Sequence, residues 1–154
     1  MIRPATAADA HELYIMIQQS FKKYEKANVP ASALTETTAS LEKKLSTTFH
    51  AFLYVSNGHV VGVCMYQFIN DACHFHRLCV DSQYQGKGIS KKLLQQLEAC
   101  AIEEGIKELY CESRFSNCSY YLQQNYTITH YNEATSLYQL KKILTNTKKA
   151  WQCA

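Results

Sequence analysis

The sequence has few glycines and prolines, no strong excess of charge of one sign and no long apolar run. Its 154 residues include only 5 Gly and 2 Pro, which argues against long flexible linkers. The 16 Lys and Arg residues against 13 Asp and Glu give a net charge of +3, which is too weak to indicate nucleic-acid binding. No apolar run approaches the roughly 20 residues of a membrane span, and residues 1–8 do not resemble a signal peptide. We therefore expect a soluble, cytoplasmic protein with no membrane or nucleic-acid partner.

The cysteine spacing lacks the pattern of a disulfide framework or a metal site. The 7 Cys are odd in number, none forms a Cys-x-x-Cys pair, and most lie in apolar runs, where a free Cys behaves as a small hydrophobe. His74 and His76, with Cys73 and Cys79 nearby, raise the alternative of zinc. Two His on one strand face supply only half a site, and the Cys alternate to the other face. We expect no metal and a reducing compartment.

The hydrophobic pattern predicts one α+β domain. An apolar fraction of 47% and a charged fraction of 19% are ordinary for a globular protein, and the length fits one domain of roughly 100–200 residues. The expected order is β-α-α-β-β-β-α-β-α-β-β, with strands at 2–5, 49–55, 59–68, 73–80, 106–111, 126–130 and 137–144 and helices at about 6–26, 34–45, 89–104 and 117–124. Because helices interrupt a mostly antiparallel series of strands, the sheet is expected to be mixed.

Several local signals set the element boundaries. Thr6 followed by Asp9 has the pattern of a capping box. Asn57-Gly58 between two β-rich runs predicts a tight hairpin, since both residues tolerate positive φ. Gly105 and Asn125 stand where helices should stop in the left-handed conformation.

The segment 77–94 is the most informative part of the chain. It reads as a strand, a turn containing Gly86 and Gly88, and the start of a helix. The first N–H groups of a helix lack internal partners and lie at the positive end of the dipole, so they form an anion site. Lys87, Lys91 and Lys92 add positive charge. A phosphate-bearing ligand is expected, although neither GxxxxGK[ST] nor GxGxxG occurs, the latter because Lys91 stands at its third Gly.

These residues resemble the GCN5-related N-acetyltransferase (GNAT) family. The run 85–90 is similar to its [QR]xxGx[GA] loop for the acetyl-CoA pyrophosphate, and 78–81 to its fourth strand. The run 120–126 is similar to its FYxxxGF motif, and 2–6 with Asp9 to a common family start. Ser90 replaces the last small residue of the loop, and Asn125 replaces the Gly of the Tyr motif.

The resemblance implies an acetyl-CoA-dependent enzyme. We expect an N-acetyltransferase domain at 1–144 and a polar tail at 145–154. The acetyl group would pass from acetyl-CoA to a primary amine of a small molecule by direct attack in a ternary complex. A protein or peptide amine is the alternative acceptor, and a non-catalytic acyl-CoA sensor is the alternative function. Family habit also implies a homodimer formed by the last strands, 126–144.

The resemblance also assigns roles to residues. The coenzyme A contacts carried over are Leu78, Cys79 and Val80 for the pantetheine arm, the backbone of Gln85, Gly86, Lys87, Gly88, Ile89 and Ser90 for the pyrophosphate, and Asn117. Tyr121 matches the tyrosine that protonates the leaving thiolate, with an ordinary pKa of about 10. The alternative is that Tyr121 is one of 11 Tyr packing an apolar face.

A base must take a proton from the attacking amine. Alternation along the strand predicts that His74, His76, Leu78 and Val80 share the face of the site. His74 lies where some family members carry a Glu base, and His76 is the second candidate; each has the alternative of a structural role. Cys118, at the start of the short helix, is the alternative nucleophile of a ping-pong route.

Overall fold

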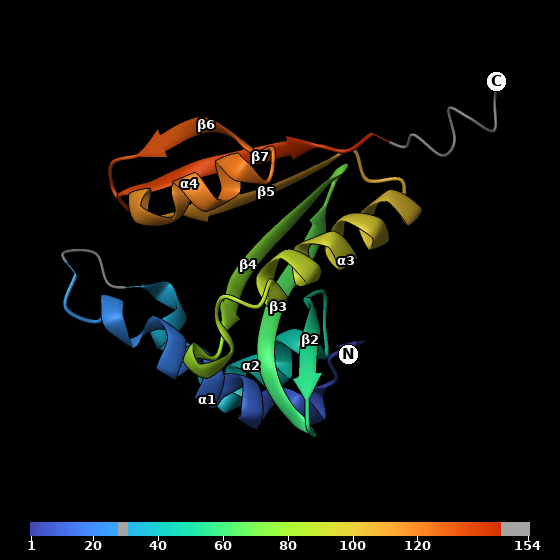
Figure 1. The fold of residues 1–154 in the computed structure, drawn as a ribbon, viewed down its shortest axis with the longest axis vertical. Helices are drawn as coiled ribbons and strands as arrows, with labels where there is room; N and C mark the ends of the chain where they lie inside the picture. The colour runs from blue at the N-terminus through green and yellow to red at the C-terminus, as the bar shows by residue number, and fades with distance from the viewer. Residues whose placement is uncertain (28–30, 146–154) are drawn as a thin grey trace. The chain divides into compact units, whose positions relative to one another are not determined.

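The computed structural model describes residues 1–27 and 31–145, and in them seven strands form one sheet of order β1-β2-β3-β4-β5-β7-β6. The strands are β1 (Ile2–Pro4), β2 (His50–Ser56), β3 (His59–Ile69), β4 (Ala72–Val80), β5 (Glu108–Ser113), β6 (Thr127–Asn132) and β7 (Leu137–Ile143). The α-helices are α1 (Ala10–Phe21), α2 (Thr38–Leu45), α3 (Ile89–Glu103) and α4 (Phe115–Gln123). The predicted α+β class and element order are confirmed (Figure 1). Residues 146–154 of the expected tail lie outside the described residues.

The chain divides into two compact units. The first comprises Met1–Gln67 and Phe75–Gln96, and the second comprises Phe68–His74 and the described residues from 97 to 145.

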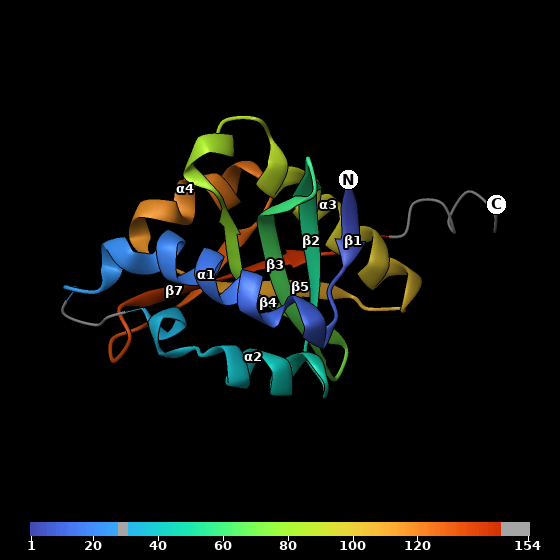
Figure 2. The ribbon, with the colours of Figure 1, turned by 90° about the horizontal axis from the view of Figure 1, so that it is seen from below.

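In the first unit, helices α1 and α2 cover one face of the strands (Figure 2). The antiparallel pairs β1–β2 and β2–β3 present alternate side chains to these helices. The core cluster formed there includes Leu13, Ile17, Leu41, Leu53 and Val63, all fully buried. On the other face Gly62 lies close to α3, because a Cβ there would meet Ile89 Cγ2 at 2.9 Å.

In the second unit, β7 lies between β5 and β6 and is antiparallel to both. The start of β4 pairs in parallel with β5, placing Ala72 opposite Glu108 and His74 opposite Tyr110. Helix α4 lies over β5 and β7 (Figure 1). Fully buried Leu109 and Leu140 contribute to the interior of this unit.

The hairpin, the capping box and the two helix stops that the sequence predicts are present in the structure. Asn57 and Gly58 have φ of 50° and 77°, and Thr6 N donates to Asp9 Oδ2 at 2.8 Å. Gly105 and Asn125 take φ of 74° and 71° after α3 and α4. The predicted first helix stops early, since α1 ends at Phe21 and is followed by a 3₁₀ turn, Lys22–Tyr24. No helix in the described ranges has the length and apolar character needed to cross a membrane.

Candidate active site

The turn between β4 and α3 has the backbone shape that an anion cradle needs. Gly86 and Gly88 take φ of 78° and 76°, and a Cβ on either would meet nothing within 4 Å. Glycine is therefore required by backbone conformation at these positions and not by crowding. Lys92 N donates to Gly88 O at 3.0 Å and begins the helical ladder, so the amide groups just before it face the open end of α3.

Hydrogen bonds hold this turn to the strand that precedes it. Asp81 Oδ1 accepts from Gln83 N at 2.9 Å, and Gln85 Nε2 donates to Val80 O at 3.2 Å. Asp81 N in turn donates to Val61 O of β3 at 2.8 Å. The glycines, the helix start and these anchors together fit a pyrophosphate held by main-chain N–H groups.

Lysines supply positive charge around the turn. Lys87 Nζ lies 5.2 Å from the ring centroid of Tyr84, and Lys92 Nζ lies 5.9 Å from that of Tyr54. Both side chains and that of Lys91 are exposed. Their long stems leave the charged ends free to approach an anionic ligand.

Strand β4 departs from regular alternation at Arg77. This residue has φ of 54° inside the strand, a conformation that costs a non-glycine residue energy. His76 meets Phe49 edge-on at a ring distance of 5.5 Å, and Phe49 and Cys79 both pack against the core cluster. Positions 76 and 79 thus share a face although they are three apart. The expectation that His74, His76, Leu78 and Val80 share one face is therefore wrong, because one residue in the left-handed region shifts the alternation.

The packing of Cys79 against the core makes its thiol unavailable to a ligand. Burial raises the pKa of its thiol to about 12, although a hydrogen bond with Ser20 and the charge of Arg77 act in the opposite direction. A thiol packed in the core leaves only the backbone of Cys79 to contact a ligand.

The Arg77 side chain enters a buried cluster of charges. Arg77 Nη1 donates to Ser32 Oγ at 3.1 Å, and Nη2 lies 3.8 Å from Glu36 Oε1. Lys44 Nζ lies 2.5 Å from the same oxygen. Burial lowers the pKa of Arg77, and the negative charge of Glu36 opposes this change. Glu36 Oε2 and Arg77 Nε are buried and make no hydrogen bond in the described part of the chain.

His74 lies in the second unit, in a different environment. Its Nε2 is 2.5 Å from Glu112 Oε2, and its ring stacks on Tyr110 with centroids 4.7 Å apart. The side chains of His74 and Glu112 are 23% and 39% exposed. An imidazole held by a carboxylate and by a stacked ring has a fixed orientation, and a partly exposed one can exchange protons.

Helix α4 carries Tyr121 and Asn117. The Tyr121 ring meets those of Tyr120 and Tyr126 edge-on, at 5.2 and 5.7 Å. Asn117 lies in the first turn, where its N–H donates to Arg114 O at 2.9 Å. The helix begins two residues earlier than expected, at Phe115.

Cys118 of α4 does not have the environment of an activated nucleophile. Burial raises the pKa of its thiol, and its Sγ donates to Arg114 O at 3.5 Å. A thiol that stays protonated near neutral pH is a poor nucleophile. The described ranges also contain no group of three His, Cys, Asp or Glu side chains able to hold a metal ion.

The sequence did not predict three residues that contact the candidate site residues: Glu112, Tyr110 and Glu36. The expected strand stopped at Cys111, one residue short of Glu112, although β5 runs to Ser113. Alternation along a longer strand would have placed residues 110 and 112 on one face. Nothing in the sequence signals that Glu36 pairs with Arg77, since the contact joins segments about 40 residues apart.

Comparison with known proteins agrees with this geometry. Residues 12–126 match the family model described as the acetyltransferase (GNAT) family. No curated protein sequence matches.

Solved structures share the fold at low sequence identity. PaiA N-acetyltransferase from Thermoplasma acidophilum, solved in complex with coenzyme A, is 16% identical with a TM-score of 0.81, covering 93% of this chain and 98% of that one. The ribosomal-protein-alanine N-acetyltransferase of Brucella melitensis is 21% identical with a TM-score of 0.75, covering 94% and 99%. The ribosomal-protein-S18-alanine N-acetyltransferase of Escherichia coli is 16% identical with a TM-score of 0.73, covering 94% and 95%. Because the family model spans most of the sequence, the chain belongs to the GNAT family and is an acetyl-CoA-dependent N-acetyltransferase.

Proposed function

We propose that this acetyltransferase acts on a primary amine of a small molecule by direct attack in a ternary complex with acetyl-CoA. The observation that carries the proposal is the His74–Glu112 pair, held at 2.5 Å on a partly exposed sheet face. A positioned imidazole of this kind can take a proton from an amine without being sealed from solvent.

Coenzyme A is assigned to the first unit. The backbone N–H groups of residues 85–90 hold the pyrophosphate, supported by the positive φ of Gly86 and Gly88 and by the start of α3. The backbone of residues 78–80 pairs with the pantetheine arm. Asn117 of α4 is assigned a polar contact with the cofactor, on the family resemblance.

The transfer then needs two proton movements. His74 accepts a proton from the amine, whose nitrogen bonds to the thioester carbonyl carbon. The carbon–sulfur bond breaks as the intermediate collapses, and Tyr121 gives its phenolic proton to the departing thiolate. The products are the acetamide and the coenzyme A thiol. His74 releases its proton to solvent and Tyr121 takes one up, so both groups return to their starting states.

A protein amine is the second candidate acceptor. It is supported by the two fold relatives whose names specify ribosomal-protein alanine as the residue acetylated. At 16% and 21% identity this support comes from fold relatives alone, so the small-molecule acceptor is preferred.

The test is thiol release from acetyl-CoA across a panel of alkylamines, diamines and alanine-terminated peptides. Release with a small amine supports the proposal, and Tyr121→Phe should lower kcat about 10²-fold. Tyr120→Phe is the matched control on the same helix and should leave kcat within about twofold. Binding of acetyl-CoA without release for any amine would favour the acyl-CoA sensor, and release with the peptides alone would favour the protein acceptor.

A further inference from the structure

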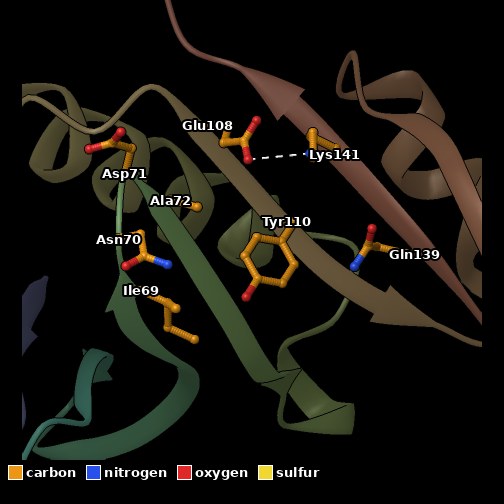
Figure 3. Close-up of a pocket in the computed structure, with 8 residues that line it drawn as sticks. All are labelled: Ile69, Asn70, Asp71, Ala72, Glu108, Tyr110, Gln139 and Lys141. Atoms are coloured by element: carbon orange, nitrogen blue, oxygen red, sulfur yellow. Dashed lines mark ion pairs between the residues drawn. The ribbon is translucent and has the colours of Figure 1, made fainter.

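The second unit contains an open cavity that the proposed steps do not use. Its volume is about 410 Å³, within the range of small-molecule sites. Its lining comes from the turn between β3 and β4, from the start of β4, and from β5 and β7. The residues are Ile69, Asn70, Asp71, Ala72, Glu108, Tyr110, Gln139 and Lys141 (Figure 3).

The charges around this cavity are mainly negative. Glu108 and Lys141 form an ion pair, drawn as a dashed line in Figure 3, with 3.3 Å between Oε1 and Nζ. The charges of the two side chains therefore nearly cancel. Asp71 is exposed, and its carboxylate forms no ion pair among residues 1–27 and 31–145. A cationic group would therefore be attracted to the cavity on balance.

Tyr110 contributes a ring and a hydroxyl to the same cavity. Figure 3 shows its ring between Asn70 and Ile69 on one side and Gln139 on the other. Burial raises the pKa of Tyr110, and the negative charges of Glu112 and Glu108 raise it further. The potential at this hydroxyl is therefore negative, and an aromatic face is itself a favourable surface for an ammonium ion.

One residue that lines the cavity, Tyr110, also contacts the candidate base. Tyr110 lies opposite His74 in the β4–β5 register and stacks on its ring. Glu108, Tyr110 and Glu112 alternate on β5, so a rise of about 3.3 Å per residue puts Tyr110 roughly 7 Å from Glu112 along the strand. A short flexible chain can span from the His74–Glu112 pair into the cavity.

We propose that this cavity binds a second ammonium group of the acceptor, so that the preferred substrate is a free diamine or polyamine. The near amine is deprotonated at His74 while the far ammonium is held by the Asp71 carboxylate and the Tyr110 ring. The proposal rests on the proposed function for the first amine. It goes further by assigning the acceptor a second positive charge.

The experiment compares diaminobutane with butylamine in the thiol-release assay. We expect diaminobutane to have the higher kcat/KM, and Asp71→Asn to lower it about fivefold, the effect of one partly exposed ion pair. Lys141→Gln removes the lysine that competes with the bound ammonium, so it should raise kcat/KM for diaminobutane. Butylamine turnover should be unaffected by either variant, and Glu133→Gln, an exposed carboxylate on the β6–β7 turn, is the matched control. A dilysine peptide offers the same two charges from a polypeptide and should be the poorer substrate.

Direct binding separates failure of the cavity from failure of the enzyme. Chemical shifts of Tyr110 and Gln139 are followed as diaminobutane is added without acetyl-CoA. Shifts that weaken in Asp71→Asn and in high salt support the cavity even where no amine is turned over. Equal turnover of butylamine and diaminobutane, unchanged by Asp71→Asn and Lys141→Gln, overturns the proposal and leaves the acetyltransferase assignment intact. A dilysine peptide that outperforms diaminobutane overturns the choice of a free diamine.

Discussion

The two compact units each hold a group of opposite charges, and the two groups differ in burial. In the first unit Glu36 is 6% exposed, and its Oε2 is buried without a hydrogen bond from any described residue. In the second unit the His74 and Glu112 side chains are 23% and 39% exposed. The buried Glu36 carboxylate cannot return to water, so its contacts with Lys44 of α2 and Arg77 of β4 are assigned to stabilising the fold. The second group contributes little to folding and so is available for chemistry.

Glu36→Gln should give the largest effect in either group. It leaves the Arg77 guanidinium buried without its carboxylate partner, and loss of one partner of a buried pair costs about 3 kcal/mol. The free energy of unfolding in urea measures this loss. Glu42→Gln removes an exposed carboxylate from α2, the helix that follows Glu36, and should change stability by less than about 0.5 kcal/mol. Equal effects of the two substitutions would contradict the structural role of the buried group.

His74→Ala should act on catalysis and leave stability nearly intact. Loss of a general base lowers kcat/KM by about 10², as steady-state kinetics measures. His130→Ala, an exposed histidine on β6, is the control and should keep kcat/KM within about twofold. If His76→Ala lowers kcat/KM this far while His74→Ala does not, the base has been assigned to the wrong histidine.

Glu112→Gln should have a smaller effect on the same step. The amide still contacts the imidazole but no longer stabilises its charged form, so we expect kcat to fall about tenfold with little change in the KM for acetyl-CoA. Steady-state kinetics with acetyl-CoA varied at saturating amine measures kcat and this KM separately. A change confined to that KM would indicate that Glu112 serves the binding of acetyl-CoA and not the proton transfer.

The smallest effect is expected at the surface pair of Arg3 and Asp9. The hydrogen bond from Arg3 lowers the pKa of Asp9, so the stabilisation is present above the ordinary carboxyl pKa of about 4 and is lost as pH falls through the lower folded value. Arg3→Leu should cost less than about 1 kcal/mol at pH 7, and less still as the pH falls below about 4. Thermal unfolding as a function of pH tests this, and a loss that does not change with pH would rule out the charge as its cause.

The fold could be predicted from the sequence because residues at turns and helix ends have distinctive conformational preferences. The Asn57-Gly58 hairpin, the stops at Gly105 and Asn125 and the glycines of the 85–90 turn each follow from a conformation that few residues adopt. Such signals are contained in a few neighbouring residues. The element order, and from it the fold class, could therefore be predicted before any packing was known.

Contacts between residues far apart in the sequence could not be predicted from local patterns. The left-handed Arg77 looks like any other strand residue in the sequence, and it overturned the predicted alternation of β4. The pairing of His74 with Glu112 depends on the β4–β5 register, which neither strand encodes alone. The roles of Tyr121, Asn117 and the 78–80 backbone remain predictions from the family resemblance.

The central claim is that the 85–90 turn binds the pyrophosphate of acetyl-CoA through its backbone, and calorimetric titration tests it most directly. Gly86→Ala and Gly58→Ala impose the same strain, because the two glycines have φ of 78° and 77° and open space around the missing Cβ. Only Gly86 lies in the turn, so we predict at least tenfold weaker acetyl-CoA binding for Gly86→Ala and wild-type affinity for Gly58→Ala. Wild-type affinity in both variants would contradict the claim.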